Sequence, residues 1–133
     1  MTTLLHATAR MHLPSIAERG LLPRSYWSND AELASYYRET VEDDGESSVL
    51  LAVDLCHLDA AFLLPDLPGI EEPITTVIAF WSAEEVWETW SRSGRTWQDS
   101  LAIVHSLCYD RAIPAARLRV ATKNGWRPLV DCL

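Results

Sequence analysis

The side chains best suited to chemistry lie in the first third of the chain. His6 and Thr8 follow a short apolar run and are separated by a single alanine. A buried strand that ends here would deliver an imidazole and a hydroxyl to the mouth of a cleft. Such groups hydrogen-bond polar ligands, and aromatic side chains further along the chain can stack on rings. We therefore expect His6, Thr8, Ser28, Tyr36 and Tyr37 to line one pocket.

Other kinds of reactive site are disfavoured by residue spacing. No two of the four histidines have the i, i+4 spacing of a helical zinc site, and no Cys-x-x-Cys supports them, so we expect no metal site. There is no Gly-x-Ser-x-Gly turn, and the five glycines do not cluster into a phosphate-binding loop. The three cysteines are expected to be free, with Cys56 and Cys108 buried, although a cysteine nucleophile stays open.

The composition is that of one folded domain spanning residues 1–133, with 48% hydrophobic and 23% charged residues. A formal net charge of −8 disfavours nucleic acid as a partner and favours a basic protein. No apolar run approaches the roughly 20 residues needed to cross a bilayer, so no membrane partner is expected. Because the amino end does not resemble a secretory signal, we expect a cytoplasmic location.

The elements that must position these side chains follow from local patterns. In the first half we expect a strand over 3–8, a helix over 13–19 stopped by Gly20, a helix capped within 28–30 that frays at Thr40, and a strand over 48–55. The stretch 48–55 is apolar on both faces and should therefore be central.

In the second half we expect a long loop over 59–76 and an extended run over 76–81. A helix opened by Ser82 should follow, with Val86, Trp87 and Trp90 toward the core. The remaining expected elements are a strand over 100–109 and two strands over 117–122 and 126–130, joined at Asn124-Gly125. The fold class is therefore α+β, with five to seven strands and two or three helices.

The order of these motifs resembles the ADP-ribosyltransferase superfamily, which includes ADP-ribosylating toxins and RNA 2′-phosphotransferases. The resemblance covers residues 4–55, and a weaker match follows over 96–101 and 109–118. Its motifs are His-small-Thr, a helix, Gly20-Leu-x-Pro23, Tyr26-Trp-Ser28, a helix with tyrosines, and a strand that ends in Val-Asp-Leu. It implies an ADP-ribosyltransferase-like split β-sheet core, with NAD as the cofactor.

Site roles carry over from that resemblance. His6 would hydrogen-bond the 2′-hydroxyl of the nicotinamide-side ribose, Thr8 would help to seat that sugar, and the backbone at Ala7 would hold the carboxamide. Ser28 would form the pocket wall, and Tyr36 or Tyr37 would stack on the nicotinamide ring. Arg10 and Arg24 are the nearest cations for the pyrophosphate, because a guanidinium matches phosphate oxygens.

The family also uses a late glutamate, which this chain lacks, since residues 101–109 contain no acidic side chain. The candidates nearby are Gln98, Asp99, His105 and Asp110. Gln98 could orient an acceptor and Asp99 could supply charge to an oxocarbenium-like sugar. The predicted catalytic residues are therefore His6, Tyr37, Gln98 and Asp99.

The resemblance implies an NAD-dependent ADP-ribosyltransferase that modifies a protein target. The small size suits a phage or toxin effector, such as an inhibitor of a host defence complex. One alternative is a catalytically silent binding protein or inhibitor on the same scaffold, which the missing glutamate favours. Another is an RNA 2′-phosphotransferase-like enzyme, which would need converging arginines and is disfavoured by the acidic charge.

Overall fold

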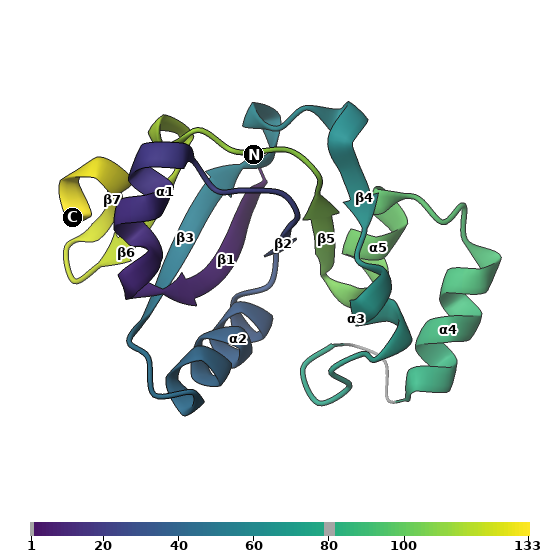
Figure 1. Ribbon diagram of the computed structural model, residues 1–133. Helices are drawn as coiled ribbons and strands as arrows, with labels where there is room; N and C mark the ends of the chain where they lie inside the picture. Colours follow the sequence, from purple (N-terminus) through teal and green to yellow (C-terminus); the bar gives the residue numbers. More distant parts are fainter. Residues whose placement is uncertain (1, 79–81) are drawn as a thin grey trace.

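The computed structural model describes residues 2–78 and 82–133 and has a mixed α+β architecture (Figure 1). The strands are β1 (Thr3–Ala9), β2 (Ser25–Ser28), β3 (Ser48–Asp54), β4 (Leu63–Pro65), β5 (Ser106–Tyr109), β6 (Arg119–Thr122) and β7 (Gly125–Pro128). The α-helices among the described residues are α1 (Leu13–Arg19), α2 (Ala31–Asp43), α3 (Leu67–Glu71), α4 (Ala83–Arg92) and α5 (Trp97–Val104). In this described part of the chain, none of the helices has the length and apolar character needed to span a bilayer.

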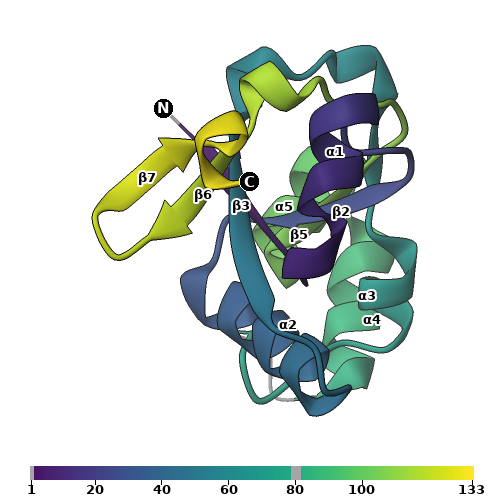
Figure 2. The same ribbon diagram turned by 60° about the vertical axis from the view of Figure 1, so that its left-hand side comes forward.

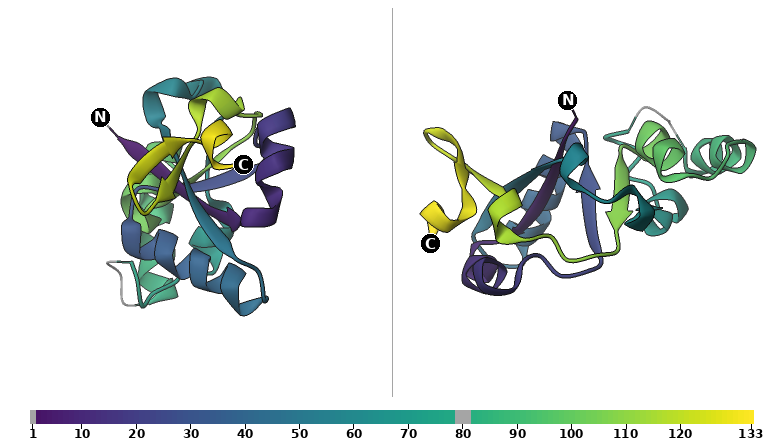
Figure 3. Two further views of the ribbon diagram at one scale, coloured as in Figure 1. Left: turned by 90° about the vertical axis from the view of Figure 1, so that its left-hand side faces the viewer. Right: turned by 90° about the horizontal axis from the view of Figure 1, so that it is seen from above.

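The strands form one antiparallel seven-stranded sheet in the order β4-β5-β2-β1-β3-β6-β7. β1 and β3 pair along their whole length, whereas β1 and β2 are in register only at Leu5↔Ser28. The sheet is therefore narrowest at the β1–β2 junction. Seen from above, it extends from the β6–β7 hairpin at one end to helices α3, α4 and α5 at the other (Figure 3).

Two buried clusters stabilise the molecule. The larger one joins the sheet to α1 and includes Leu4, Trp27, Leu51 and Leu107, each at most 1% exposed. The smaller one joins α3, α4 and α5; its members are Ile70, Ile78, Val86, Trp90, Ile103 and Val104. The β6–β7 hairpin projects beyond the rest of the molecule (Figure 2), and every residue of β7 is exposed.

Several local predictions are confirmed. α1 has the predicted bounds, and Gly20 ends it with a φ of 77°. α2 begins after Asp30, whose carboxylate accepts hydrogen bonds from Glu32 N and Leu33 N, as predicted for a cap within 28–30. The predicted fraying at Thr40 is wrong, because α2 continues to Asp43. β3 lies between β1 and β6, as expected of a strand that is apolar on both faces.

Two element predictions are wrong. The expected loop over 59–76 contains β4 and α3, because Asp66 caps a helical turn whose second residue is proline. The expected strand over 100–109 is the end of α5 followed by β5, with His105 in the left-handed region between them. The described chain therefore has five helices rather than two or three.

Three smaller predictions also need correction. In the expected extended run over 76–81, residues 75–77 form a turn, and 79–81 lie outside the described residues. Trp87 is 51% exposed, because the buried face of α4 passes through Val86 and Trp90, four residues apart. Cys56 is exposed, because β3 ends at Asp54 and a 3-10 turn follows, whereas Cys108 is buried as predicted.

Candidate functional site

A cavity of about 590 Å³ lies where the β1–β2 junction meets helices α2 and α3, and we call it the central cavity. Figure 1 shows α2 and α3 on opposite sides of this region. β1 contributes Leu5, His6 and Ala7, and β2 contributes Tyr26, Trp27 and Ser28. Helix α2 contributes Tyr36, Tyr37 and Thr40, and the segment that includes α3 contributes Asp66, Gly69 and Glu72. Segments far apart in the sequence thus meet at one place.

His6 is fixed across the junction between the two strands. Its Nδ1 lies 2.6 Å from the carbonyl oxygen of Tyr26, and its ring lies 5.2 Å from that of Trp27. Because a carbonyl only accepts, Nδ1 carries the proton and donates. Burial lowers the pKa of His6, although the bond to Tyr26 acts in the opposite direction. The imidazole is therefore neutral at neutral pH, and Nε2 is left as an acceptor for a ligand.

Tyr36 and Tyr37 form an aromatic rim on α2. Their rings meet edge to face, with centroids 5.7 Å apart. They are 41% and 39% exposed, so a ligand in the cavity can reach their faces. Burial, followed by the negative charge of Asp66, raises the pKa of Tyr37. Its hydroxyl therefore stays protonated at neutral pH, and it lies within electrostatic reach of Asp66.

Asp66 is a carboxylate held rigidly in the cavity wall and only 4% exposed. Its Oδ1 accepts from Gly69 N at 2.9 Å, and its Oδ2 accepts from the Ser106 hydroxyl at 2.6 Å. Its own N–H donates to Ser100 Oγ at 2.9 Å, and that hydroxyl donates to the Ser106 carbonyl. A Cβ at Gly69 would collide with the carboxylate, so a larger residue there would force the Asp66 side chain to shift.

Ser28 forms part of the cavity wall, but its hydroxyl is already hydrogen-bonded within the protein. Its Oγ donates to the His105 carbonyl at 2.7 Å and accepts from Asp30 N at 2.9 Å. These bonds fix the turn from β2 into α2 and so orient the helix that carries the tyrosines. Of the predicted site residues, His6, Ala7, Ser28, Tyr36 and Tyr37 line the central cavity together.

The other predicted site residues lie elsewhere. Thr8 and Arg10 are not among the residues that line the cavity. Gln98 and Asp99 lie on α5, and the Asp99 carboxylate closes a capping box with Thr96. Hydrogen bonds from Thr96 accordingly lower the pKa of Asp99. Neither α5 residue is brought to the cavity.

Arg24 lies just outside the cavity. Its Nε is 3.3 Å from an Asp110 carboxylate oxygen, and both side chains are largely exposed. Burial raises the pKa of Tyr26, and the Arg24 charge acts in the opposite direction. Arg24 therefore lies near Tyr26, a residue of the cavity wall, and its guanidinium is paired with Asp110.

Asp66 and Glu72 were not predicted from the sequence, because the glutamate of the resembling family lies late in the chain, near residue 100. A signal for Asp66 existed: an aspartate two residues before a proline is typical of a helix N-cap. Nothing in the sequence alone indicates that this cap lines the same cavity as His6. Asp66 and Glu72 are the charged side chains among the lining residues described, and neither Lys nor Arg lines the cavity. The cavity therefore favours a cationic or neutral group over a phosphate.

Within residues 2–78 and 82–133, no three His, Cys, Asp or Glu side chains are grouped so that they could hold a metal ion. Comparison with family models, with curated proteins and with solved structures finds no match for this chain. The cavity itself is therefore the basis for assigning a function.

Proposed function

We propose that the central cavity binds the nicotinamide–ribose end of NAD and that this chain is an ADP-ribosyltransferase acting on a protein. The observation that carries the proposal is the convergence of His6, Ala7, Ser28, Tyr36 and Tyr37 on one cavity from three separate elements. The narrow β1–β2 junction, where the cavity opens, supports the split β-sheet core of that superfamily.

The cavity suits the oxidised nicotinamide riboside group. The nicotinamide ring is cationic, and aromatic faces beside carboxylates attract cations. Tyr36 or Tyr37 would stack on this ring, and Asp66 would face its charge. His6 Nε2 would accept a hydrogen bond from the 2′-hydroxyl of the ribose, and the backbone at Ala7 would hydrogen-bond the carboxamide. The diphosphate would leave through the opening toward Arg24.

The reaction breaks the bond between the ribose C1′ and the nicotinamide nitrogen. The bonding electrons leave with nicotinamide, and the sugar becomes an oxocarbenium-like cation that a nearby carboxylate stabilises. A nucleophilic side chain of the target attacks C1′ and loses a proton. Asp66, held by two hydrogen bonds, would stabilise the sugar cation, and the exposed Glu72 would accept the proton. These carboxylates take the roles first assigned to Gln98 and Asp99.

The decisive experiment is incubation of the protein with NAD, with and without candidate targets, followed by an assay for free nicotinamide. Nicotinamide release is expected from the wild type. His6→Ala should abolish both release and labelling of the target, whereas His12→Ala, which changes an exposed histidine outside the cavity, should retain them. Equal release by the two variants would contradict the proposal.

A catalytically silent binding protein on the same scaffold is the second candidate. It is favoured by a cavity without Lys or Arg to hold a diphosphate, and by the net charge of −8. It predicts a stable complex with a basic protein that weakens as salt is raised, and no release of nicotinamide under any condition.

An RNA 2′-phosphotransferase-like enzyme would need arginines around a phosphate in the cavity. Arg10, Arg19, Arg24, Arg111 and Arg117 are all absent from its described lining. RNA binding that falls steeply with salt would support this activity, and a flat response would exclude it.

A further inference from the structure

A second cavity lies at the other end of β5. Ser106 begins this strand and lines the central cavity, whereas Tyr109 ends it and lines a separate cavity of about 380 Å³. The second cavity lies between segment 56–59 and the connection that follows β5. Arg111 and Arg117 line it, so we call it the arginine cavity. Nothing in the proposed transferase chemistry uses it.

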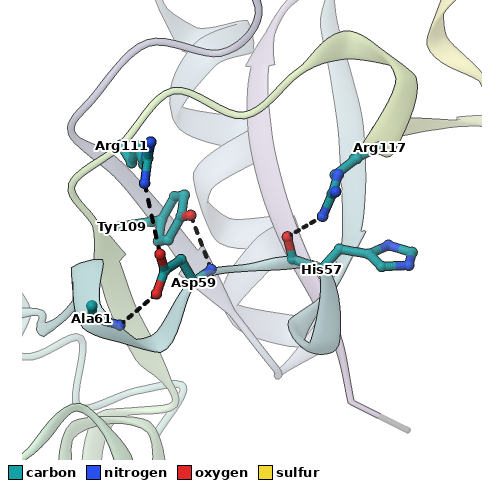
Figure 4. Close-up of polar contacts among 6 residues, drawn as sticks. All are labelled: His57, Asp59, Ala61, Tyr109, Arg111 and Arg117. Carbon is teal, nitrogen blue, oxygen red and sulfur yellow. Dashed lines mark hydrogen bonds and ion pairs between the residues drawn. The ribbon is translucent and has the colours of Figure 1, made fainter.

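Both guanidinium groups contact the same short segment (Figure 4). Arg117 Nη1 donates to the His57 carbonyl at 2.7 Å. Arg111 Nη1 lies 3.6 Å from an Asp59 carboxylate oxygen, and its guanidinium lies 4.7 Å from the centre of the Phe62 ring. Segment 57–59 is itself held by Tyr109, whose hydroxyl accepts from Asp59 N at 3.0 Å.

These contacts leave donors unused. A guanidinium has five N–H groups, and the bond from Arg117 to His57 uses one of them. Arg111 faces a single carboxylate oxygen at 3.6 Å, a distance at which the pair is loose, and 58% of its side chain is exposed. Both cations can therefore turn N–H groups toward an anion with little rearrangement, and such forks match phosphate oxygens.

The charge of this cavity is opposite to that of the central cavity. Two guanidiniums and one carboxylate line it, in a chain whose formal net charge is −8. Apolar side chains complete the wall, among them Leu58, Ile113 and Pro114. The size leaves room for a sugar-sized group beside a phosphate. We propose that the arginine cavity binds a small phosphate monoester through Arg111 and Arg117.

The test is isothermal titration of the full chain at low salt with ribose 5-phosphate, inorganic phosphate and ribose. Ribose 5-phosphate should bind, inorganic phosphate should bind more weakly, and ribose should not bind. Arg117→Gln should weaken binding of ribose 5-phosphate by about tenfold. Glutamine retains a donor for the His57 carbonyl, and an unchanged melting temperature would verify that this variant is folded.

Asp59→Asn provides the opposite change. Asparagine can still accept the hydrogen bond from Ala61 N and so cap the following turn. The negative charge that competes for Arg111 is removed, so ribose 5-phosphate should bind several-fold more tightly. Arg127→Gln, which removes an exposed cation from β7, is the matched control and should leave affinity unchanged.

Three results would overturn the proposal: no binding of ribose 5-phosphate, an equal loss from Arg127→Gln and Arg117→Gln, or an unchanged or weaker affinity in Asp59→Asn. His6→Ala separates the two sites. Loss of ribose 5-phosphate binding in His6→Ala would place the ligand in the central cavity and so contradict the present proposal. The transferase proposal would be unaffected.

Discussion

His6 is the side chain whose protonation state most directly controls what the central cavity can bind. Its Nδ1 donates to the Tyr26 carbonyl, and burial lowers its pKa below the usual value of about 6.5. In the neutral ring, Nε2 is an acceptor, as a ribose hydroxyl requires. Protonation would turn Nε2 into a donor and place a charge in the cavity wall.

The lowered pKa predicts an acid-sensitive fold. Between the folded pKa and about 6.5, the unfolded chain binds a proton that the folded chain does not. The stabilisation from neutral His6 is therefore fully present above about pH 6.5 and is lost as the pH falls through the folded pKa. His6→Gln should flatten this part of the pH dependence of the unfolding free energy, measured by urea denaturation.

His12→Gln is the control, because His12 is exposed. It should keep the pH dependence of the wild type. Equal flattening in both variants would mean that general charge effects, rather than the environment of His6, cause the sensitivity.

Asp66 and Gly69 form a second testable pair. A methyl group at residue 69 would collide with the Asp66 carboxylate, so Gly69→Ala should destabilise the protein by about 1–3 kcal/mol. The loss should be smaller when Asp66→Ala has already made room. Urea unfolding of the two single variants and the double variant measures this coupling, and strictly additive losses would contradict it.

At the residue scale, the sequence predicted those cavity residues whose positions follow from the local periodicity of a strand or a helix. His6 and Ala7 follow from the predicted first strand, although β1 continues past them to Ala9, and Tyr36 and Tyr37 follow from the helical spacing of their segment. Asp66 could not be found in this way, because its place in the wall of the central cavity depends on the pairing of β5 with both β2 and β4. Asp99 was predicted from its position in the sequence, whereas in the structure it closes the capping box of α5 and does not line the cavity.

At the scale of elements, α2 links stability to ligand binding. It packs on β1 and β3 and presents both rim tyrosines to the cavity. Its first turn depends on Asp30, whose Oδ1 accepts from Glu32 N at 2.9 Å and from Leu33 N at 3.0 Å. Loss of this cap would loosen the end of the helix nearest β2.

Asp30→Ala should therefore cost about 1 kcal/mol of unfolding free energy and weaken the proposed binding of NAD. Asp44→Ala removes the same charge at the other, exposed end of α2 and should have little effect on either quantity. Thermal denaturation and a binding titration measure the two effects. An equal change in both variants would show that charge, rather than capping, is responsible.

The elements that the sequence predicted well have strong end signals, such as Gly20 after α1 and the Asn-Gly turn between β6 and β7. The missed elements have weak or conflicting signals. α3 is only five residues long and begins in a proline-rich segment. The apolar residues of α5 continue into β5, so periodicity alone does not separate helix from strand, and the boundary depends on the left-handed conformation of His105.

At the scale of the whole molecule, the two buried clusters predict two levels of stability. Trp90, 4% exposed, lies in the smaller cluster with residues of α3 and α5, whereas its neighbour Trp87 is 51% exposed. Trp90→Ala should cost about 3–5 kcal/mol, whereas Trp87→Ala should change stability by no more than about 0.5 kcal/mol.

Amide hydrogen exchange should locate this loss. Exchange in α4 and α5 should accelerate in Trp90→Ala more than exchange in β1 and β3, because the sheet belongs to the larger cluster. Uniform acceleration over the whole chain would show instead that the two clusters unfold as one unit.

The single residue pair that joins β1 to β2 also has a mechanical consequence. Few backbone hydrogen bonds join the two parts of the sheet at Leu5↔Ser28, and the central cavity lies beside this junction. A ligand that contacts His6 on one strand and Asp66 beyond the other would brace the two halves against each other. Ligand binding in the central cavity would then slow amide exchange in β2 and β5 as well as at the contacting residues. The exchange rates of these strands would therefore show whether the cavity is filled.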